Sequence, residues 1–184
     1  MSITKIDPRT ALVIIDLQHG IVAMNTCHPV KTVIDNCCKL VDKFRQCSLP
    51  IVFVNVDGSA PGRTDNMKSH AQKPSNWSQL IDELQPQQGD ILITKKAWGA
   101  FTLTELHSVL TSLNISQLVI GGLVTSMGVE STARQGFELG YNITLPTDAM
   151  SDFNIIAHDH SVTSTFPKLA ETGSTNDVLN TLGC

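Results

Sequence analysis

Two side chains of opposite charge, Asp16 and Lys95, lie where short apolar runs end and are the first candidates for acid–base chemistry. Asp16 closes the run ALVIID, and Lys95 closes the run ILITK. Burial raises a carboxyl pKa, whereas a lysine ammonium within about 4–6 Å lowers it by roughly 1–3 units. Each residue also has an ordinary interpretation, since Asp16 could cap the next segment and Lys95 could be a solvated strand end. Lys96 follows directly, and because neighbouring strand residues point to opposite sides, at most one of the two lysines enters a common pocket.

The segment VIGGLVTSMGVESTAR, residues 119–134, is the next candidate. Gly121–Gly122 ends an apolar run, and Leu123–Thr125 leads into a helix that is predicted to begin near Met127. Free backbone N–H groups and the positive dipole end of a helix could hold a developing negative charge, as an oxyanion hole does. The glycines could instead serve only close packing of helix on strand. The segment contains no GxGxxG motif, so dinucleotide binding is not supported.

Aromatic and histidine residues give weaker indications. Trp77, Trp98 and Phe101 lie in or beside predicted loops, although aromatic residues make up only 5% of the chain. Gathered at a pocket mouth they would suit a flat or apolar small ligand, but each could equally be a packing residue. His158 and His160 are expected to be an exposed pair at a helix start. Because no CxxC or HExxH motif is present, we expect neither a metal nor a cofactor.

Composition excludes several classes of function. Lys and Arg total 13 and Asp and Glu 17, which gives a net charge of −4 and argues against a nucleic-acid or anionic-membrane surface. No apolar run approaches the roughly 18–20 residues of a membrane span, and the start MSITKIDPRT lacks a signal-peptide core, so we expect a cytoplasmic protein with a small-molecule substrate. The cysteines number five, which does not indicate a disulfide framework. Cys37 and Cys47 fall on a helical apolar stripe and are expected in the core.

Two hydrophobic periods alternate along the chain, one typical of buried parallel strands and one typical of helices. The predicted strands are Ala11–Asp16, Ile51–Val56, Ile91–Thr94, Leu118–Ile120, Ile143–Leu145 and an extended piece near Leu169–Thr172. The predicted helices are Val30–Cys47, Trp77–Leu84, Leu103–Leu113, Met127–Leu139, Ile155–Thr165 and Asn176–Leu182, the last capped by Ser174 or Thr175. The alternation predicts an α/β fold, a parallel sheet with helices on both faces.

Ligands of such sheets bind beyond the carboxyl ends of the strands. Asp16, Lys95 and Asp148 lie at such ends, as do residues 55–57 and 122–128. After the second strand, the polar residues 57–76 predict a long loop, which is often a pocket wall or a lid. Arg63 in this loop could close over a carboxylate or could simply be solvated.

Three segments, ALVIIDLQHGIV, TKKAWGAFTLTEL and VIGGLVTSMGVESTARQGFELGYNITLPTDAM, resemble in order and spacing the isochorismatase-like hydrolases. This superfamily with the cysteine-hydrolase fold includes isochorismatases, nicotinamidases and N-carbamoylsarcosine amidases, and the resemblance covers roughly residues 9–182. It implies a three-layer, doubly wound (Rossmann-like) sheet of six mainly parallel strands. It also implies one domain over residues 1–184 and assembly into homo-oligomers.

The resemblance also assigns roles by position. Asp16, in an I-D-x-Q segment with Gln18, matches the catalytic aspartate, and Lys95 matches the catalytic lysine. Gly128 occupies the position of the nucleophilic cysteine. The peptide bond Leu123–Val124 matches a cis bond beside an oxyanion hole, whose donors would be the N–H groups of Val124 and Gly128.

The departures from the family pattern bear on the reaction. Without a thiol at Gly128 the thioester route of the amidases is closed, and the metal ligands of nicotinamidases are missing around residues 55–58. Isochorismatase members also carry a smaller residue at this position, and there the aspartate is thought to protonate an enol-ether carbon before water completes the cleavage. A dicarboxylate substrate would need cationic clamps, for which Arg63, His70 and Arg134 are candidates.

Three functions therefore stay open. The first is a thiol-independent hydrolase that uses Asp16 and Lys95 for acid–base hydrolysis of an enol ether or related bond in a small, possibly carboxylated molecule. The second is a catalytically inactive small-molecule binder of the same superfamily. The third is a flavodoxin-like nucleotide module, although no phosphate loop supports it.

Overall fold

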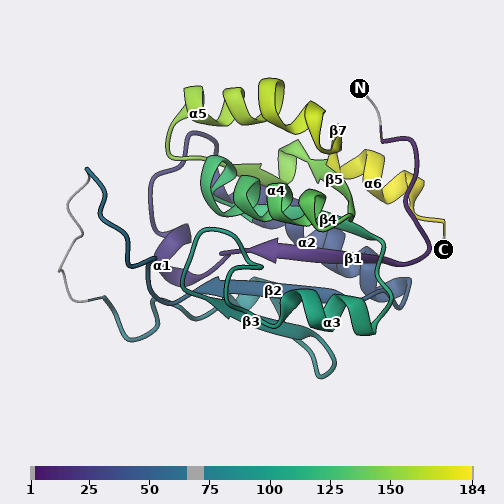
Figure 1. Ribbon diagram of the computed structural model, residues 1–184, viewed down its shortest axis with the longest axis horizontal. Coiled ribbons are helices and arrows are strands. Elements are labelled where there is room, and N and C mark those ends of the chain that lie inside the picture. The colour runs from purple at the N-terminus through teal and green to yellow at the C-terminus, as the bar shows by residue number, and fades with distance from the viewer. Residues whose placement is uncertain (1–2, 66–72, 184) are drawn as a thin grey trace.

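The computed structural model describes residues 3–65 and 73–183, and a parallel sheet forms its middle layer (Figure 1). The strands are β1 (Thr10–Ile15), β2 (Ile51–Val56), β3 (Ile91–Lys95), β4 (Gln117–Leu123), β5 (Asn142–Pro146), β6 (Met150–Ser151) and β7 (Glu171–Gly173). Their order is β3-β2-β1-β4-β5-β7, and every pairing is parallel. The α/β fold class is confirmed, with the two-residue β6 added beside β4 as a seventh strand.

Helices cover both faces of this sheet. They are α1 (His19–Val22), α2 (Val30–Gln46), α3 (Leu106–Ser112), α4 (Glu130–Glu138), α5 (Ile155–His160) and α6 (Thr175–Thr181). Ser174 caps α6 through a reciprocal capping box with Asp177, so the first of the two predicted caps is the one used. Among the described residues no helix is long and apolar enough to cross a bilayer.

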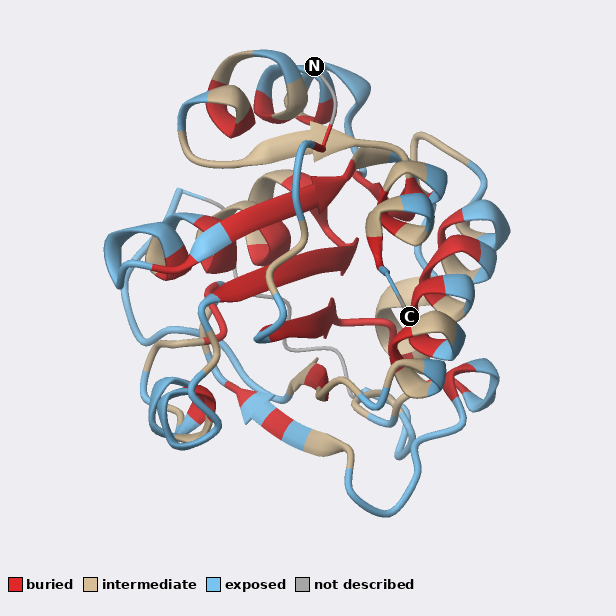
Figure 2. Ribbon diagram, turned by 90° about the vertical axis from the view of Figure 1, so that its right-hand side faces the viewer, coloured by how far each residue is buried: buried red, intermediate tan, exposed pale blue. Residues whose placement is uncertain are grey.

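Successive side chains of β1 point to opposite faces of the sheet, and the core is accordingly divided into two clusters. Leu12 and Ile14 pack on the α2 side, and Ala11, Val13 and Ile15 pack on the α3 and α4 side. The central strands β1 and β4 are buried along their length, whereas the edge strand β3 alternates between buried and exposed residues (Figure 2). A strand buried on both faces reads as a continuous apolar run, which is why β1 was recognisable from its sequence.

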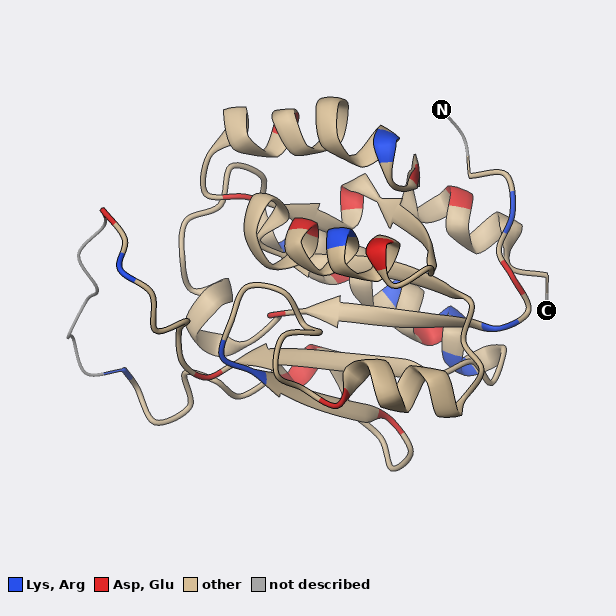
Figure 3. Ribbon diagram, in the orientation of Figure 1, with Lys and Arg blue, Asp and Glu red and all other residues tan. Residues whose placement is uncertain are grey.

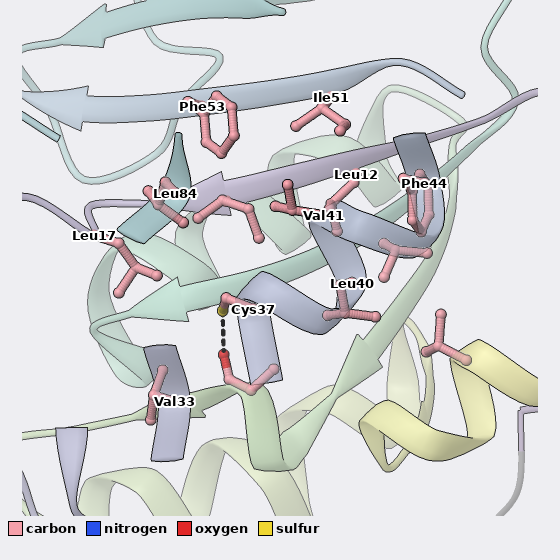
Figure 4. Packing of buried hydrophobic residues seen from close by; sticks show 14 of the residues in the cluster. Leu12, Leu17, Val33, Cys37, Leu40, Val41, Phe44, Ile51, Phe53 and Leu84 are labelled. Atoms are coloured by element: carbon pink, nitrogen blue, oxygen red, sulfur yellow. Dashed lines mark hydrogen bonds between the residues drawn. The ribbon is translucent and has the colours of Figure 1, made fainter. Parts of the chain in front are cut away.

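The first cluster contains Cys37, as expected. Its side chain lies among Leu12, Leu40 and Phe44, and its Sγ contacts the carbonyl oxygen of Ala149 at 3.4 Å (Figure 4). Burial raises the pKa of this thiol above its ordinary range. Cys37 is therefore an inert packing residue.

The strand order places the switch point of the sheet between β1 and β4. The chain runs from β1 through β2 to β3 on one side and from β4 through β5 to β7 on the other. The arrowheads of β1 and β2 point toward the side where α1 lies, and the parallel pairing gives the other strands the same direction (Figure 1). A crevice forms beyond the carboxyl ends at such a switch point, so the ends of β1 and β4 face one another there.

Acidic and basic residues intermix along the ribbon (Figure 3).

One predicted helix is wrong. Within Trp77–Leu84 only the three-residue 3-10 turn Asp82–Leu84 is helical. The backbone of this segment pairs instead with the chain after β1: His19 N–H donates to the Gln79 carbonyl at 2.9 Å. An eight-residue segment is too short to form a stable helix alone, so contacts with distant parts of the chain decided its structure.

Candidate active site

Asp16 and Lys95 form a buried ion pair across the ends of β1 and β3. Lys95 Nζ lies 2.6 Å from Asp16 Oδ2, and the two side chains are 2% and 8% exposed. Lys95 Nζ also donates to the Ala97 carbonyl at 3.3 Å. Lys96 is exposed, so only one of the two lysines enters the site. The predicted meeting of the two residues, 79 positions apart, is thus present in the structure.

Asp16 holds its proton more tightly than an ordinary aspartic acid does. Burial raises the pKa of Asp16 to about 6, although the charge and the hydrogen bond of Lys95 oppose that shift. Among the described residues, Asp16 Oδ1 has no hydrogen-bond partner. A proton on this oxygen would therefore be free to pass to a bound molecule.

Local backbone geometry turns Asp16 out of the strand. Its φ of 51° lies in the left-handed region, where Asp is enriched among non-glycine residues. On the neighbouring strand Gly122 has a φ of 115°, and a Cβ atom there would lie 2.1 Å from the Ile15 carbonyl oxygen. Only glycine allows β4 to approach β1 so closely, which explains the second glycine of the VIGG motif.

Gly128 lies directly against the ion pair. A Cβ atom at this position would lie 2.9 Å from Ile15 Cγ2 and 3.1 Å from Asp16 Oδ2. Position 128 is therefore adjacent to the carboxylate, and it is too tight for a larger residue without movement of Ile15. No cysteine of the described chain lines the cavity described below.

A cavity of about 200 Å³ joins these groups. Its lining residues are Asp16, Ile21, Val56, Gly58, Ser59, Ala60, Lys95, Ala97, Trp98, Val124, Met127, Gly128 and Phe153. Most of these side chains are apolar, and within the described lining Lys95 is the only cation. A larger, more open hollow of about 390 Å³ lies beside Asp7, Tyr141 and Glu171, away from the ion pair.

The turn after β4 forms one wall of the cavity. The Leu123–Val124 peptide bond is cis, as the sequence pattern implied. The helix begins as a π-helical turn, Thr125–Val129, two residues earlier than predicted, and continues as α4. Val124 and Gly128 line the cavity, whereas Leu123 is buried in the core. This places the turn next to Asp16 and Lys95.

Several predicted binding residues lie outside the cavity. Gln18 is fully buried, and its side chain bonds both the N–H and the carbonyl of Val56, so it fixes the end of β2. Trp77 packs its ring on Gly20, and Arg63 is exposed outside the lining. These three predictions of direct binding are not supported by the geometry.

Phe101 and Thr125 are also placed elsewhere. Phe101 stacks on Tyr141 with ring centroids 5.9 Å apart and belongs to the core on the α3 and α4 side. Thr125 turns away from the cavity, and its Oγ1 lies 2.9 Å from His158 Nδ1. Of the three aromatic residues proposed, only Trp98 reaches the cavity, where it is 60% exposed at the mouth. His70 lies outside the described residues.

Sequence reasoning missed most of the apolar lining. Ile21, Met127 and Phe153 come from three separate segments, and none of them carries a chemical signal of its own. The expectation for His158 was wrong, because it is buried near the end of α5, while His160 is exposed. Burial, together with the nearby His28, lowers the pKa of His158.

Known proteins resemble this chain in sequence and in fold. The isochorismatase domain family matches residues 10–177. The isochorismatase family protein YwoC of Bacillus subtilis is 39% identical over 178 residues and 93% of each chain. The ureidoacrylate amidohydrolase RutB of Klebsiella variicola is 31% identical over 76% of this chain and 72% of its own. A solved isochorismatase family structure from Burkholderia thailandensis has a TM-score of 0.93 at 34% identity, covering 98% of this chain and 99% of that one. The chain belongs to the isochorismatase family.

Proposed function

We propose that this protein is a hydrolase of small molecules in which Asp16 acts as a general acid and no enzyme thiol takes part. The observation that carries the proposal is the buried Asp16–Lys95 pair beside Gly128, with Asp16 Oδ1 left unpartnered in a cavity. A carboxyl group whose pKa is about 6 keeps a useful fraction of its proton near neutral pH.

The reaction proposed is cleavage of an enol ether or a related bond. Asp16 gives its proton to the enol-ether carbon, which leaves a cation stabilised by the adjacent oxygen. Water adds to the cationic carbon and gives one proton back to Asp16, which forms a hemiketal. The hemiketal then breaks its bond to the ether oxygen, its hydroxyl proton passes to that oxygen, and the products are a ketone and an alcohol. Lys95 stabilises the carboxylate while it lacks its proton, and the N–H groups of Val124 and Gly128 are the proposed donors to the negative charge that develops on the departing oxygen.

The substrate proposed is small and largely apolar. The cavity of about 200 Å³ is below the roughly 300–1,000 Å³ of drug-sized sites. Lys95, its one cation within the described lining, is already paired with Asp16. At least one carboxylate of a dicarboxylate substrate would have no cationic partner, which is unfavourable in a buried site. A neutral or singly charged molecule fits this lining better.

A variant pair tests the proposal. Enol ethers, amides and esters with small apolar groups are screened with the native protein, with Asp16→Asn and with Asp57→Asn. Asp57 is a matched control, because it is an exposed acid just after β2. Turnover should fall about 10²–10⁴-fold in Asp16→Asn, which lacks the acid, and should not change in Asp57→Asn. Full turnover by a folded Asp16→Asn variant would refute the assignment.

The pH profile gives a second readout of the same role. If the protonated carboxyl is the active form, kcat/KM falls as pH rises through about 6. A rise of kcat/KM through that range would make Asp16 a base instead.

A second function, binding without turnover, is favoured by the glycine at position 128, where the family resemblance would place a nucleophilic cysteine. No turnover in the whole screen, together with a ligand-dependent rise in Tm, would select it.

We further propose, on the family resemblance, that the chain forms homo-oligomers. Ile155 and Ile156 at the start of α5 expose 45% and 76% of their surface, which is consistent with a partner covering them. Light scattering of the purified chain measures the oligomer mass, and a monomer would contradict the proposal.

A further inference from the structure

A second cluster of chemically capable side chains lies outside the cavity. Cys27 and His28 follow α1, and His158 belongs to α5, some 130 residues further along the chain. One donor atom from each of the three lies within 4.8 Å of the others. His158 is buried and the other two are half-buried, so the cluster is neither a surface group nor part of the apolar core.

Three donor atoms of this region are spaced as metal ligands are. Cys27 Sγ lies 3.4 Å from His28 Nδ1 and 3.4 Å from Ser151 Oγ. His28 Nδ1 lies 3.2 Å from the same oxygen. Tetrahedral zinc, with bonds of about 2.3 Å to sulfur and 2.0–2.2 Å to nitrogen or oxygen, separates its ligand atoms by roughly 3.3–3.6 Å. The three atoms therefore form a triangle close to one face of such a tetrahedron.

His158 is held in an orientation suitable for a ligand. Its Nδ1 is hydrogen-bonded to Thr125 Oγ1 at 2.9 Å, which leaves Nε2 as the free ring nitrogen. Metal-binding histidines almost always have their second ring nitrogen held by an oxygen in this way. The rings of His28 and His158 meet edge to face, with centroids 4.7 Å apart, so both imidazoles border the same space.

A buried acid adds negative charge to the surroundings. Asp152 is 2% exposed, its carbonyl accepts from the Cys27 N–H at 2.6 Å, and its Oδ2 accepts from the Ser126 N–H at 2.7 Å. The charge of this carboxylate acts on His158 and favours a cation there over a neutral ligand.

We propose that Cys27, His28 and His158 bind one zinc ion, with Ser151 Oγ or a water as the fourth ligand. One thiolate and two imidazoles are ligands that zinc prefers. On binding, the Cys27 thiol releases its proton to solvent and the resulting thiolate bonds the ion, so no oxidant or reductant is needed.

The ion has a positioning role in this arrangement. It joins the segment after α1 to β6 and α5, and Thr125 extends the connection to the turn that carries Gly128. None of the proposed zinc ligands lines the active-site cavity, so the ion would not contact the Asp16–Lys95 pair. The inference stands independently of the proposed hydrolysis.

The test uses the full chain, freed of metal with a chelator and then titrated with Zn²⁺ by calorimetry. One ion per chain is expected, with a Tm that rises with zinc concentration. Co²⁺ in place of zinc should give a thiolate-to-cobalt charge-transfer absorption. Cys27→Ser and His158→Gln should weaken zinc binding more than about 100-fold, and Thr125→Val, which removes only the outer partner, roughly 10–100-fold.

Matched controls separate this site from adventitious binding. Cys38→Ser removes another half-buried free cysteine, and His160→Gln removes an exposed histidine of the same helix. Both should bind zinc as the native chain does. The proposal is overturned if native and Cys27→Ser proteins bind zinc equally, or if cobalt binds without a thiolate band. The cobalt measurement needs only the native chain, so a variant that fails to fold leaves the proposal testable.

Discussion

The floor and the rim of the cavity are built in different ways. Asp16, Lys95 and Gly128 on the floor are buried and come from the ends of β1 and β3 and the turn after β4. Residues 58–60 and Trp98 on the rim are exposed and belong to loops. Strand ends inside a packed sheet fix the geometry of the reacting groups, whereas loops can change without disturbing the fold. We therefore expect the floor to set the proposed reaction and the rim to set the choice of substrate.

The largest effect should come from breaking the ion pair on the floor. Lys95→Met leaves Asp16 buried without its cation, so the free energy of unfolding at pH 8 should fall by about 3–5 kcal/mol. The loss should be smaller at pH 5, because a protonated Asp16 needs no cation. Turnover should fall about 10²–10⁴-fold. Urea unfolding at both pH values and steady-state kinetics measure these changes.

Lys96→Met is the matched control, since this neighbour is exposed. Its stability should change by less than about 0.5 kcal/mol. Equal losses in the two variants would mean that the floor is no more constrained than the surface.

A smaller effect is expected from filling the floor. In Gly128→Ala the new methyl group meets Ile15 and Asp16 at 2.9 and 3.1 Å, so overpacking should destabilise the protein by about 1–3 kcal/mol and disturb the ion pair. Gly62→Ala in the exposed loop is the control, because a Cβ atom there meets no atom of the described residues within 4 Å. Thermal unfolding measures the stability of both variants. A Gly128→Ala variant as stable as the native protein would show that the site can accept a side chain.

The smallest effect should come from the rim. Trp98→Ala removes an exposed ring at the cavity mouth, so KM should rise roughly tenfold while kcat changes little, which corresponds to about 1.4 kcal/mol of binding. Leu92→Ala is the control, since Leu92 is also 60% exposed but lies outside the cavity. A fall in kcat without a change in KM would place Trp98 among the reacting groups instead.

The same division explains what the sequence could predict. Asp16 and Lys95 were recognisable because each closes an apolar run, and the carboxyl ends of parallel strands meet at one edge. The glycine at 122 was recognisable, but its reason, a backbone contact with Ile15, needed coordinates. Periodicity carries information about strands and helices that pack on the core, and the floor is built from these.

The rim and its surroundings could not be predicted in this way. Trp77, Trp98 and Phe101 look alike in the sequence, yet they lie respectively on Gly20, at the cavity mouth and on Tyr141. Their positions depend on long-range packing of loops, which leaves no local pattern. The pairing of Cys27 and His28 with His158 is equally invisible, because the two segments are joined only by the fold.

The account depends most on the protonation state of Asp16. The direct measurement is a carbon-13 NMR titration of its carboxyl group, assigned by comparison with Asp16→Asn. The account predicts an apparent pKa of about 6, because burial outweighs the attraction of Lys95. A pKa at or below the ordinary 3.8 would contradict it, since well under about 1% of Asp16 would then carry a proton at pH 7, against roughly a tenth for a pKa of about 6.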